Sequence, residues 1–385
     1  MNMRGLAILL LAALTLSACG PHRGLHFEQT GVTSGQVEPG STSGSIHVKS
    51  ATTVLSRPYT LTTQGHTIWA GVQFADRYQA MQAVGTDTAQ GRGIVNLPPS
   101  VKVVAALAST PGVIWMLTYE PAGAHWRLQR LGTHVEPARS AARAIVPARR
   151  DSLATLEPVL SLRGSTELLG ASNSAVWLLS YHKHSYTLLR CDARTLRVTR
   201  FPLTSDGRPG VAITPERVFV LLPAHRRHAV SIETRDPSGR VTATSPLVQL
   251  AGQLMSSAVS ACGTQIAGFA NRRGFTVVVR LDAAGSPPRY SRHFSALANG
   301  RRQAGGYVTA SFGTASTFGP HCRSIWVATE EATYPGPSIG FVTRLDTSTL
   351  NVTGRIGNVV ADRLLWTGGS LWVSDLEHAA ILRIG

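Results

Sequence analysis

Three short polar segments of the chain contain neighbouring histidine or arginine residues, and both residue types can bind ligands. Arginine holds carboxylates and phosphates through paired hydrogen bonds, and a neutral imidazole nitrogen is a good zinc ligand. Each segment follows a short apolar stretch, as a loop between two strands would. We predict that the segments bind an anionic ligand through His182, His184, His225, Arg226, Arg227, His228, Arg272 and Arg273.

The four histidines also define an alternative, which is a metal-dependent enzyme. They lie in two segments and could share a divalent ion only if the two loops leaned toward one another. A Gly-rich phosphate loop and a Cys-x-x-Cys pair are absent from the sequence. We therefore expect a binding protein without catalytic residues, metal or cofactor, and keep a metal-dependent lyase or lactonase as the alternative.

The elements that would position these segments form a repeat. A turn followed by a short apolar strand with a central aromatic residue recurs at intervals of roughly 50 residues. The central positions of the seven copies are Trp69, Trp115, Trp177, Phe219, Ala267, Trp326 and Trp372. We expect these side chains to pack between neighbouring repeats, with Phe269 compensating for the small Ala267.

A second pattern follows most copies: an apolar strand, then an aspartate, then a tight polar turn. It occurs at Asp87, Asp192, Asp236, Asp282 and Asp346. An aspartate in such a turn accepts hydrogen bonds from backbone amides about two residues further on. We therefore interpret these aspartates as structural residues that close hairpins.

Each repeat then contains about four short strands, which is the content of one propeller blade. The predicted fold is an all-β, seven-bladed β-propeller of four-stranded blades over residues 45–385. The last repeat ends at Gly385 before its fourth strand, so an N-terminal strand should close the ring and cover the open edge. Two segments could supply that strand, residues 45–49 or residues 54–61.

In such a propeller, the loops between the second and third strands of each blade share a face with the connections between blades. The three histidine and arginine segments would form a basic arc on this face, together with Arg208 from a connection. Glu330, Glu331 and Asp375 would form an acidic arc in the last two blades. A rim of this kind attracts anions to its basic side.

The repeat resembles those of the bacterial YVTN, NHL and virginiamycin-lyase-like propellers. The similarity is strongest at Leu371-Trp372-Val373 and in the run RLDTSTLNVTGRIG of residues 344–357, and it extends over roughly residues 45–385. The resemblance implies a propeller fold. Because these propellers include lyases, lactonases and binding scaffolds, it does not imply one activity.

The N-terminus has the pattern of an export signal. Arg4 precedes an uncharged apolar run and then Leu16-Ser17-Ala18-Cys19-Gly20, and the run is too short to span a bilayer. This resembles the bacterial lipobox, which implies removal of signal peptide 1–18 and attachment of lipid, including palmitate, to Cys19. An ordinary secretory signal with a coincidental cysteine is the alternative. Residues 19–44 are polar and small, so we expect a flexible tether.

The formal net charge of +16 favours anionic partners. The positive residues are scattered singly instead of alternating with aromatic residues, so we expect no nucleic acid partner. The expected partners are a cell membrane or outer membrane, reached through the lipid on the outside of the cytoplasm, and an anionic small molecule or an envelope protein. We expect a monomer. A scaffold that assists envelope assembly is a third possible role.

Cysteine usage leaves one pairing open. With Cys19 lipidated, Cys191, Cys262 and Cys322 remain, and the last two occupy near-equivalent places before the aromatic strands of adjacent repeats. An exported protein can form disulfides. Because packed sheets lie about 10 Å apart, a disulfide between Cys262 and Cys322 requires that the loops of the two repeats converge. We interpret Cys191 as a buried thiol.

Overall fold

The computed structural model describes the repeat region of the chain. The described residues are 46–54, 57–74, 78–98, 100–101, 103–120, 125–131, 156–224, 228–272, 275–292, 307–334 and 339–385. The predicted signal peptide, Cys19 and the tether lie outside them, as do four residues of the predicted basic arc, His225, Arg226, Arg227 and Arg273. Within these ranges no helix is long and apolar enough to cross a membrane.

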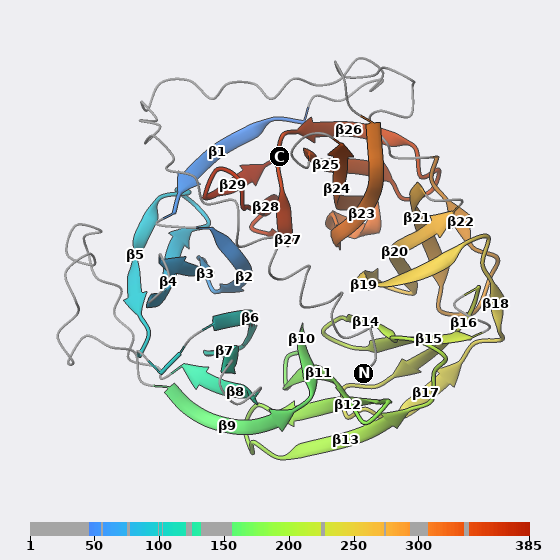
Figure 1. The fold of residues 1–385 in the computed structure, drawn as a ribbon, viewed down its shortest axis with the longest axis horizontal. Helices are drawn as coiled ribbons and strands as arrows, with labels where there is room; N and C mark the ends of the chain where they lie inside the picture. The colour runs from blue at the N-terminus through green and yellow to red at the C-terminus, as the bar shows by residue number, and fades with distance from the viewer. Residues whose placement is uncertain are drawn as a thin grey trace. The chain divides into compact units, whose positions relative to one another are not determined.

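The described strands form seven antiparallel sheets arranged in a ring (Figure 1). The predicted seven-bladed β-propeller is therefore confirmed. In the first six blades the four strands follow one another in sequence order, from the inside of the ring to the outside. Alternating apolar residues in these strands are buried against the neighbouring blades.

The first three blades lie between Pro58 and Leu203. Blade one comprises β2 (Pro58–Gln64), β3 (Thr67–Phe74), β4 (Tyr78–Gly85) and β5 (Gly91–Asn96). Blade two comprises β6 (Val103–Thr110), β7 (Val113–Glu120), β8 (His125–Leu131) and β9 (Leu156–Arg163). Blade three comprises β10 (Ser165–Ala171), β11 (Ala175–His182), β12 (Ser185–Asp192) and β13 (Val198–Leu203).

The next three blades lie between Gly210 and Gly357. Blade four comprises β14 (Gly210–Ile213), β15 (Val218–Ala224), β16 (Ala229–Arg235) and β17 (Val241–Thr244), with β18 (Val248–Gln249) also paired to β16. Blade five comprises β19 (Gln253–Cys262), β20 (Gln265–Arg272), β21 (Phe275–Asp282) and β22 (Arg289–Tyr290). Blade six comprises β23 (Tyr307–Phe318), the 3₁₀ turn η4 (Pro320–Cys322), β24 (Ser324–Tyr334), β25 (Ile339–Asp346) and β26 (Val352–Gly357).

Blade seven closes the ring by combining both ends of the repeat region. Its inner strands are β27 (Ala361–Thr367), β28 (Ser370–Asp375) and β29 (Ala380–Ile384), and its outer strand is β1 (Val48–Thr53). β1 pairs antiparallel with β29 from Val48 opposite Ile384 to Thr53 opposite Ala380. The N-terminal strand therefore supplies the missing position, as predicted, and Figure 1 shows it as the blue arc outside the red strands. The strand overlaps the earlier of the two predicted segments only at Val48 and Lys49 and continues to Thr53, whereas Pro58 to Leu61 of the later segment belong to β2.

The central aromatic residues lie between blades, as predicted. Trp115 is fully buried with side chains of blade three, and Trp177 is fully buried with side chains of blade four. Trp372 of blade seven packs in the same way against Ile68 and Ala70 of blade one, across the point of closure. Each blade therefore completes the core of its neighbour.

Blade five replaces the aromatic residue with Ala267, and Phe269 occupies the core beside it. Ala267 and Phe269 are both fully buried in one cluster with Ile325 of blade six. Space for the ring comes from Gly313 on β23, because a Cβ atom there would lie 2.4 Å from ring carbons of Phe269. The predicted compensation is thus completed by a glycine on the facing strand.

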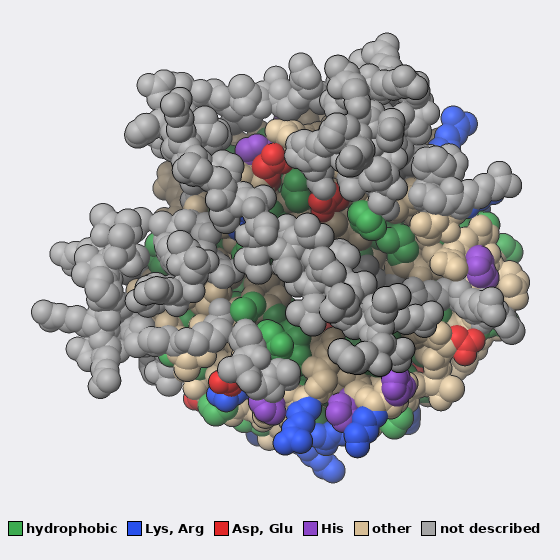
Figure 2. Space-filling view, viewed as in Figure 1, with side chains coloured by type: hydrophobic (Ala, Val, Ile, Leu, Met, Phe, Trp, Pro, Cys, Tyr) green, Lys and Arg blue, Asp and Glu red, His purple; other side chains and the backbone are tan. Residues whose placement is uncertain are grey.

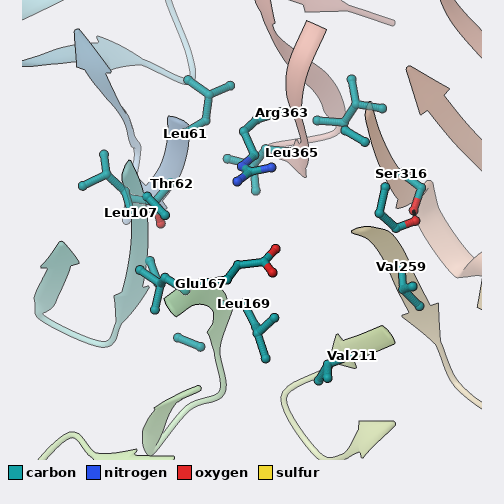
Figure 3. A pocket seen from close by; sticks show the side chains of 18 of the residues that line it. Leu61, Thr62, Leu107, Glu167, Leu169, Val211, Val259, Ser316, Arg363 and Leu365 are labelled. Atoms are coloured by element: carbon teal, nitrogen blue, oxygen red, sulfur yellow. Dashed lines mark hydrogen bonds between the residues drawn. The ribbon is translucent and has the colours of Figure 1, made fainter. Parts of the chain in front are cut away.

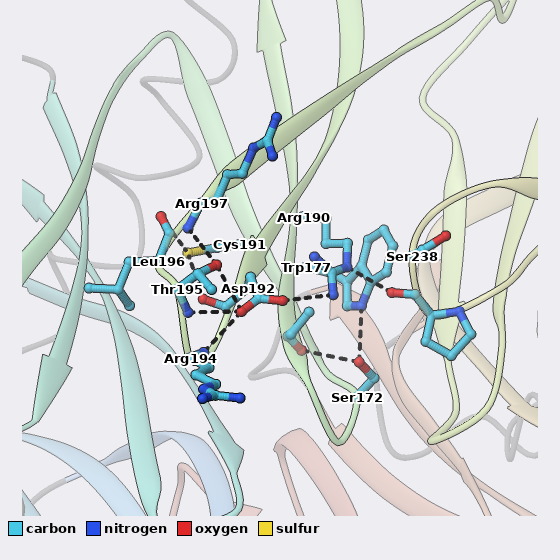
Figure 4. Close-up of polar contacts among 12 residues, drawn as sticks. Ser172, Trp177, Arg190, Cys191, Asp192, Arg194, Thr195, Leu196, Arg197 and Ser238 are labelled. Atoms are coloured by element: carbon cyan, nitrogen blue, oxygen red, sulfur yellow. Dashed lines mark hydrogen bonds and ion pairs between the residues drawn. The ribbon is translucent and has the colours of Figure 1, made fainter.

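The aspartates at the outer hairpins accept backbone hydrogen bonds, as predicted. Oδ1 of Asp192 accepts from the amides of Arg194 at 3.1 Å and Thr195 at 2.9 Å (Figure 4). These hydrogen bonds stabilise the charged form and lower the pKa of Asp192 to about 2. Asp236 and Asp346 have the same type of turn, and hydrogen bonds from serine side chains and backbone amides lower their pKa values as well.

Arginines next to these turns join consecutive blades. Nε of Arg190 on blade three donates to the carbonyl oxygen of Pro237, in the aspartate turn of blade four, at 2.7 Å. Arg280 of blade five donates in the same way to the Thr347 carbonyl of blade six. Nη1 of Arg383 in blade seven donates to the Asp87 carbonyl of blade one at 3.2 Å. Part of the arginine excess is therefore structural.

Two of the cysteines are bonded in the structure. Cys262 at the end of β19 and Cys322 in η4 form a disulfide, with Cα atoms 5.6 Å apart. The inner strands β19 and β23 converge toward the axis, which brings together ends that lie 60 residues apart in sequence. Cys191 is a buried free thiol, and burial raises its pKa to about 11, so it is protonated and unreactive at neutral pH.

Candidate functional site

The central channel of the ring contains a cavity of about 340 Å³. All seven inner strands contribute to its wall: β2, β6, β10, β14, β19, β23 and β27. Much of the lining is aliphatic, and Figure 3 shows Leu61, Leu107, Leu169, Val211, Val259 and Leu365 around it. Hydroxyl groups of Thr62 and Ser316 also line the wall. A cavity of this size suits a small molecule and not a folded partner.

Three charged side chains line the cavity, and two of them are arginines. Arg208 forms an ion pair with Glu167, and both side chains are about one-third exposed, at 36% and 33%. Arg363 reaches into the cavity from β27, toward Glu167 on β10 (Figure 3). Two guanidinium groups against one carboxylate give the cavity a net positive charge.

Local structure holds each charged residue near one end of the channel. Glu167 and Arg363 lie close to the beginning of their strands, and Arg208 lies in the connection just before β14. All inner strands begin on the face that carries the connections between blades, because the strands of each blade alternate in direction. The charged end of the cavity therefore opens toward the face that we predicted to be functional.

The backbone of Arg363 is anchored by Ser374 on the adjacent strand β28. The Arg363 amide donates to Oγ of Ser374 at 2.8 Å. In the guanidinium group, Nη1 donates to the Asp362 carbonyl oxygen at 3.3 Å. An arginine has five N–H donors, so further donors remain for a ligand in the cavity.

Comparisons with solved structures find proteins of similar fold at low sequence identity. A chain of hydrazine synthase from Kuenenia stuttgartiensis is similar with a TM-score of 0.55 at 14% identity, covering 86% of this chain and 96% of that one. BamB from Moraxella catarrhalis has a TM-score of 0.45 at 12% identity, covering 91% and 93%. TolB from Acinetobacter baumannii has a TM-score of 0.43 at 12% identity, covering 82% and 78%.

The similarity extends to the fold alone. No family model matches the sequence, and no curated protein matches it by sequence. At 14% identity, the hydrazine synthase chain shares an architecture that supports many unrelated functions. The function therefore has to be argued from the site.

The described residues of the predicted basic arc lie on three different loops. His182 and His184 are exposed at the turn between β11 and β12, His228 is exposed before β16, and Arg272 is exposed at the end of β20. The guanidinium of Arg272 lies over the Tyr290 ring, 5.9 Å from its centroid. These four described residues do not line the central cavity.

The predicted acidic arc is largely buried. The Asp375 side chain is only 2% exposed, and its Oδ2 lies 2.7 Å from Nδ1 of His378 in the turn between β28 and β29. Burial raises the pKa of Asp375, and the contact with His378 opposes this shift. Burial also raises the pKa of Asp362, where Arg363 has the opposite effect. Glu331 and Asp375 are each 1% exposed, so these two carboxylates of the predicted arc do not form an exposed anionic rim.

The described part of the chain contains no set of metal ligands that would support the metal-dependent alternative. There, no three His, Cys, Asp or Glu side chains lie close enough to hold a metal ion. Residues 336–340 have the spacing Gly-x-Ser-x-Gly; the first three of them lie outside the described residues, and Ile339 and Gly340 begin strand β25. A nucleophile elbow requires a turn from a strand into a helix.

Sequence analysis missed two of the three charged residues of the cavity. The sequence predicted Arg208 on the face that carries the connections between blades, and it did not predict Glu167 or Arg363 as site residues. Glu167 is the single charged residue of the inner strand STELLGA in repeat three, and Arg363 lies next to Asp362 in the inner strand ADRLLWT of repeat seven. A charged residue in the first strand of a repeat is the sequence signal that could have revealed them, because these strands line the channel.

Proposed function

We propose that this protein is a lipid-anchored binding module outside the cytoplasm, and that its central cavity holds a small anion with an aliphatic group. The observation that carries the proposal is Arg363, which reaches into an otherwise largely aliphatic cavity opposite the Glu167–Arg208 ion pair. The conclusion rests on the geometry of this cavity, since the similar structures support only the fold.

The charges of the cavity favour an anion. Arginine presents a planar group of donors that matches carboxylate or phosphate oxygens, and such charge-assisted hydrogen bonds are stronger than neutral ones. Glu167 already neutralises Arg208 in part, which leaves Arg363 as the main positive group for a ligand. The net charge of +16 adds a long-range attraction for anions.

The walls favour a ligand with an aliphatic group. Leucine and valine side chains from six inner strands line the cavity, and displacement of water from them by an apolar group is favourable. Each buried methylene contributes roughly 0.8 kcal/mol. An amphiphilic carboxylate would use both the arginine and the aliphatic wall.

Export is supported by the Cys262–Cys322 disulfide, since disulfides persist in oxidising compartments. The lipobox at Leu16-Ser17-Ala18-Cys19 points to the same compartment. We propose that lipid on Cys19 anchors the chain and that the propeller faces away from the cytoplasm.

Substitution of Arg363 with glutamine is expected to weaken carboxylate binding at least about tenfold, which corresponds to about 1.4 kcal/mol. The measurement is calorimetric titration of the full chain, in a non-ionic detergent, with linear carboxylates from acetate to octanoate and with inorganic phosphate. Octanoate should bind more tightly than acetate because it contacts the aliphatic wall. The variant E167Q should bind more tightly than the unmodified chain, because Arg208 is no longer neutralised.

The matched control is R240Q, since the Arg240 side chain is 80% exposed on an outer turn of blade four. The R240Q variant should bind the carboxylates and phosphate with the same affinity as the unmodified chain. The proposal is wrong if none of these anions binds, or if R363Q binds them as tightly as R240Q does.

Substitution of Cys19 with alanine is expected to abolish incorporation of labelled palmitate and to release the protein from the membrane fraction, because the thiol is the attachment point. Cys191→Ala serves as the control and should retain both label and membrane association. Persistence of the label in C19A would contradict the anchor.

A further inference from the structure

Two neighbouring blades carry a pair of aromatic side chains at the same place on the rim. The position four residues after the central aromatic residue is Tyr119 in blade two and Tyr181 in blade three. Their cross-strand neighbours are Trp126 and Tyr186. The other five blades have Gln73, Pro223, Asn271, Glu330 and Leu376 at this position. The fold therefore does not require aromatic residues there.

The four aromatic side chains are accessible and similarly arranged. Within each pair the ring centroids are 4.6 Å apart, with interplanar angles of 40° in blade two and 35° in blade three. The Tyr181 side chain is 36% exposed, and the other three are half-buried. We call Tyr119, Trp126, Tyr181 and Tyr186 the aromatic rim.

A short connection links the strands that carry the two pairs. His125, next to Trp126, pairs across the sheet with Arg163, and Gly164 follows directly. A Cβ atom on Gly164 would lie 2.4 Å from the carbonyl oxygen of Tyr181, and the φ of this glycine is +84°. Only glycine allows the chain to pass this close to the strand of Tyr181, so Gly164 fixes the path of the connection from blade two to blade three.

Basic residues lie close to the aromatic rim along strands β8, β9 and β11 and in the turn before β12. They are His125, Arg127, Arg163, His182, Lys183 and His184. Glu120 is the acidic residue among them, and it pairs with Arg127 at 2.8 Å. Figure 2 shows lysine, arginine and histidine side chains gathered along the edge where Figure 1 places β8 to β13. His182 and His184, predicted from sequence as ligand-binding residues, belong to this surface.

We infer that the aromatic rim and its basic neighbours bind an acidic polysaccharide. Sugar rings have apolar C–H faces that pack on aromatic rings, and tyrosine hydroxyl and imidazole groups can hydrogen-bond the sugar hydroxyls. Carboxylates along the polymer would pair with Lys183 and Arg163. This surface is separate from the central cavity and goes beyond the proposed function.

The geometry favours a polysaccharide over single-stranded nucleic acid, which also uses aromatic stacking and positive charge. In each pair the rings pack against one another at an angle. The two rings of a pair therefore do not form a slot with parallel walls into which a flat base could insert. A puckered sugar ring can contact the edge of one aromatic ring and the face of the other.

The test is calorimetric titration of the full chain with hexagalacturonate as the probe. The neutral maltohexaose should bind at least about tenfold more weakly, and raising NaCl from about 50 to about 300 mM should weaken hexagalacturonate binding, because salt screens exposed charges. Y119A and Y181A should each weaken binding about tenfold, and K183Q by a smaller factor. Y181F, which keeps the ring, should stay close to the unmodified chain.

Two controls separate this surface from other features. F312A removes an aromatic side chain that is 47% exposed on blade six and should leave the affinity unchanged. R363Q should also have no effect, which distinguishes the rim from the cavity. The inference is overturned if hexagalacturonate does not bind, if Y119A and Y181A bind it normally, or if a thymidine oligonucleotide of equal charge binds more tightly.

Discussion

A chain shortened to begin at Arg57 is expected to lose at least about 5 kcal/mol of folding free energy, because it lacks the closing strand β1. Ile46 and Val54 are 6% and 4% exposed and pack into the cores on either side of blade seven. Their removal, together with the ladder to β29, leaves that strand as an open edge. Since small proteins are stabilised by only about 5–15 kcal/mol, cooperative unfolding should disappear. Circular dichroism during urea titration measures this.

The control is a chain that begins at Ser45 and keeps β1. Its unfolding midpoint should match that of the full chain. Adding a peptide of residues 45–56 to the shortened chain should restore part of the lost stability, since the strand can pair in trans. Closure by β1 would be contradicted if the shortened chain unfolded at the same urea concentration as the control.

Phe269→Ala is expected to lower the free energy of unfolding by about 3–5 kcal/mol, because it removes a fully buried ring and leaves a cavity. Phe269 is the side chain that fills the space beside Ala267, where other blades have an aromatic residue. The matched control is Phe312→Ala, whose ring is 47% exposed and whose loss should change stability by less than about 0.5 kcal/mol. Urea denaturation compares the two variants directly.

The contact with Gly313 makes this prediction more specific. G313A alone should destabilise the protein, because its Cβ would lie 2.4 Å from the Phe269 ring. In the F269A background the same methyl group enters an empty space and should cost much less. Additive effects in this double-mutant cycle would show that the two residues do not share the space.

The sequence contained most of the information about the fold and little about the cavity. The seven repeated apolar strands, the aspartate turns and the absent last strand are local patterns, and each led to a correct structural prediction. The arginine links between blades were missed because Arg190, Arg280 and Arg383 find their acceptors on the next blade. Arg190 and Arg280 share one position, two residues before the aspartate of their turns, but that spacing does not reveal an acceptor on another blade.

By itself, the sequence determined the number of blades, the position of the core residues and the need for a closing N-terminal strand. These features depend on alternation and repetition within stretches of a few residues. Only the tertiary structure brought Glu167, Arg208 and Arg363 to one cavity, joined Cys262 to Cys322, and placed Tyr119 beside the blade of Tyr181. The physical reason is convergence: a ring brings residues from distant repeats to a common axis and rim, and no local pattern encodes which of them meet.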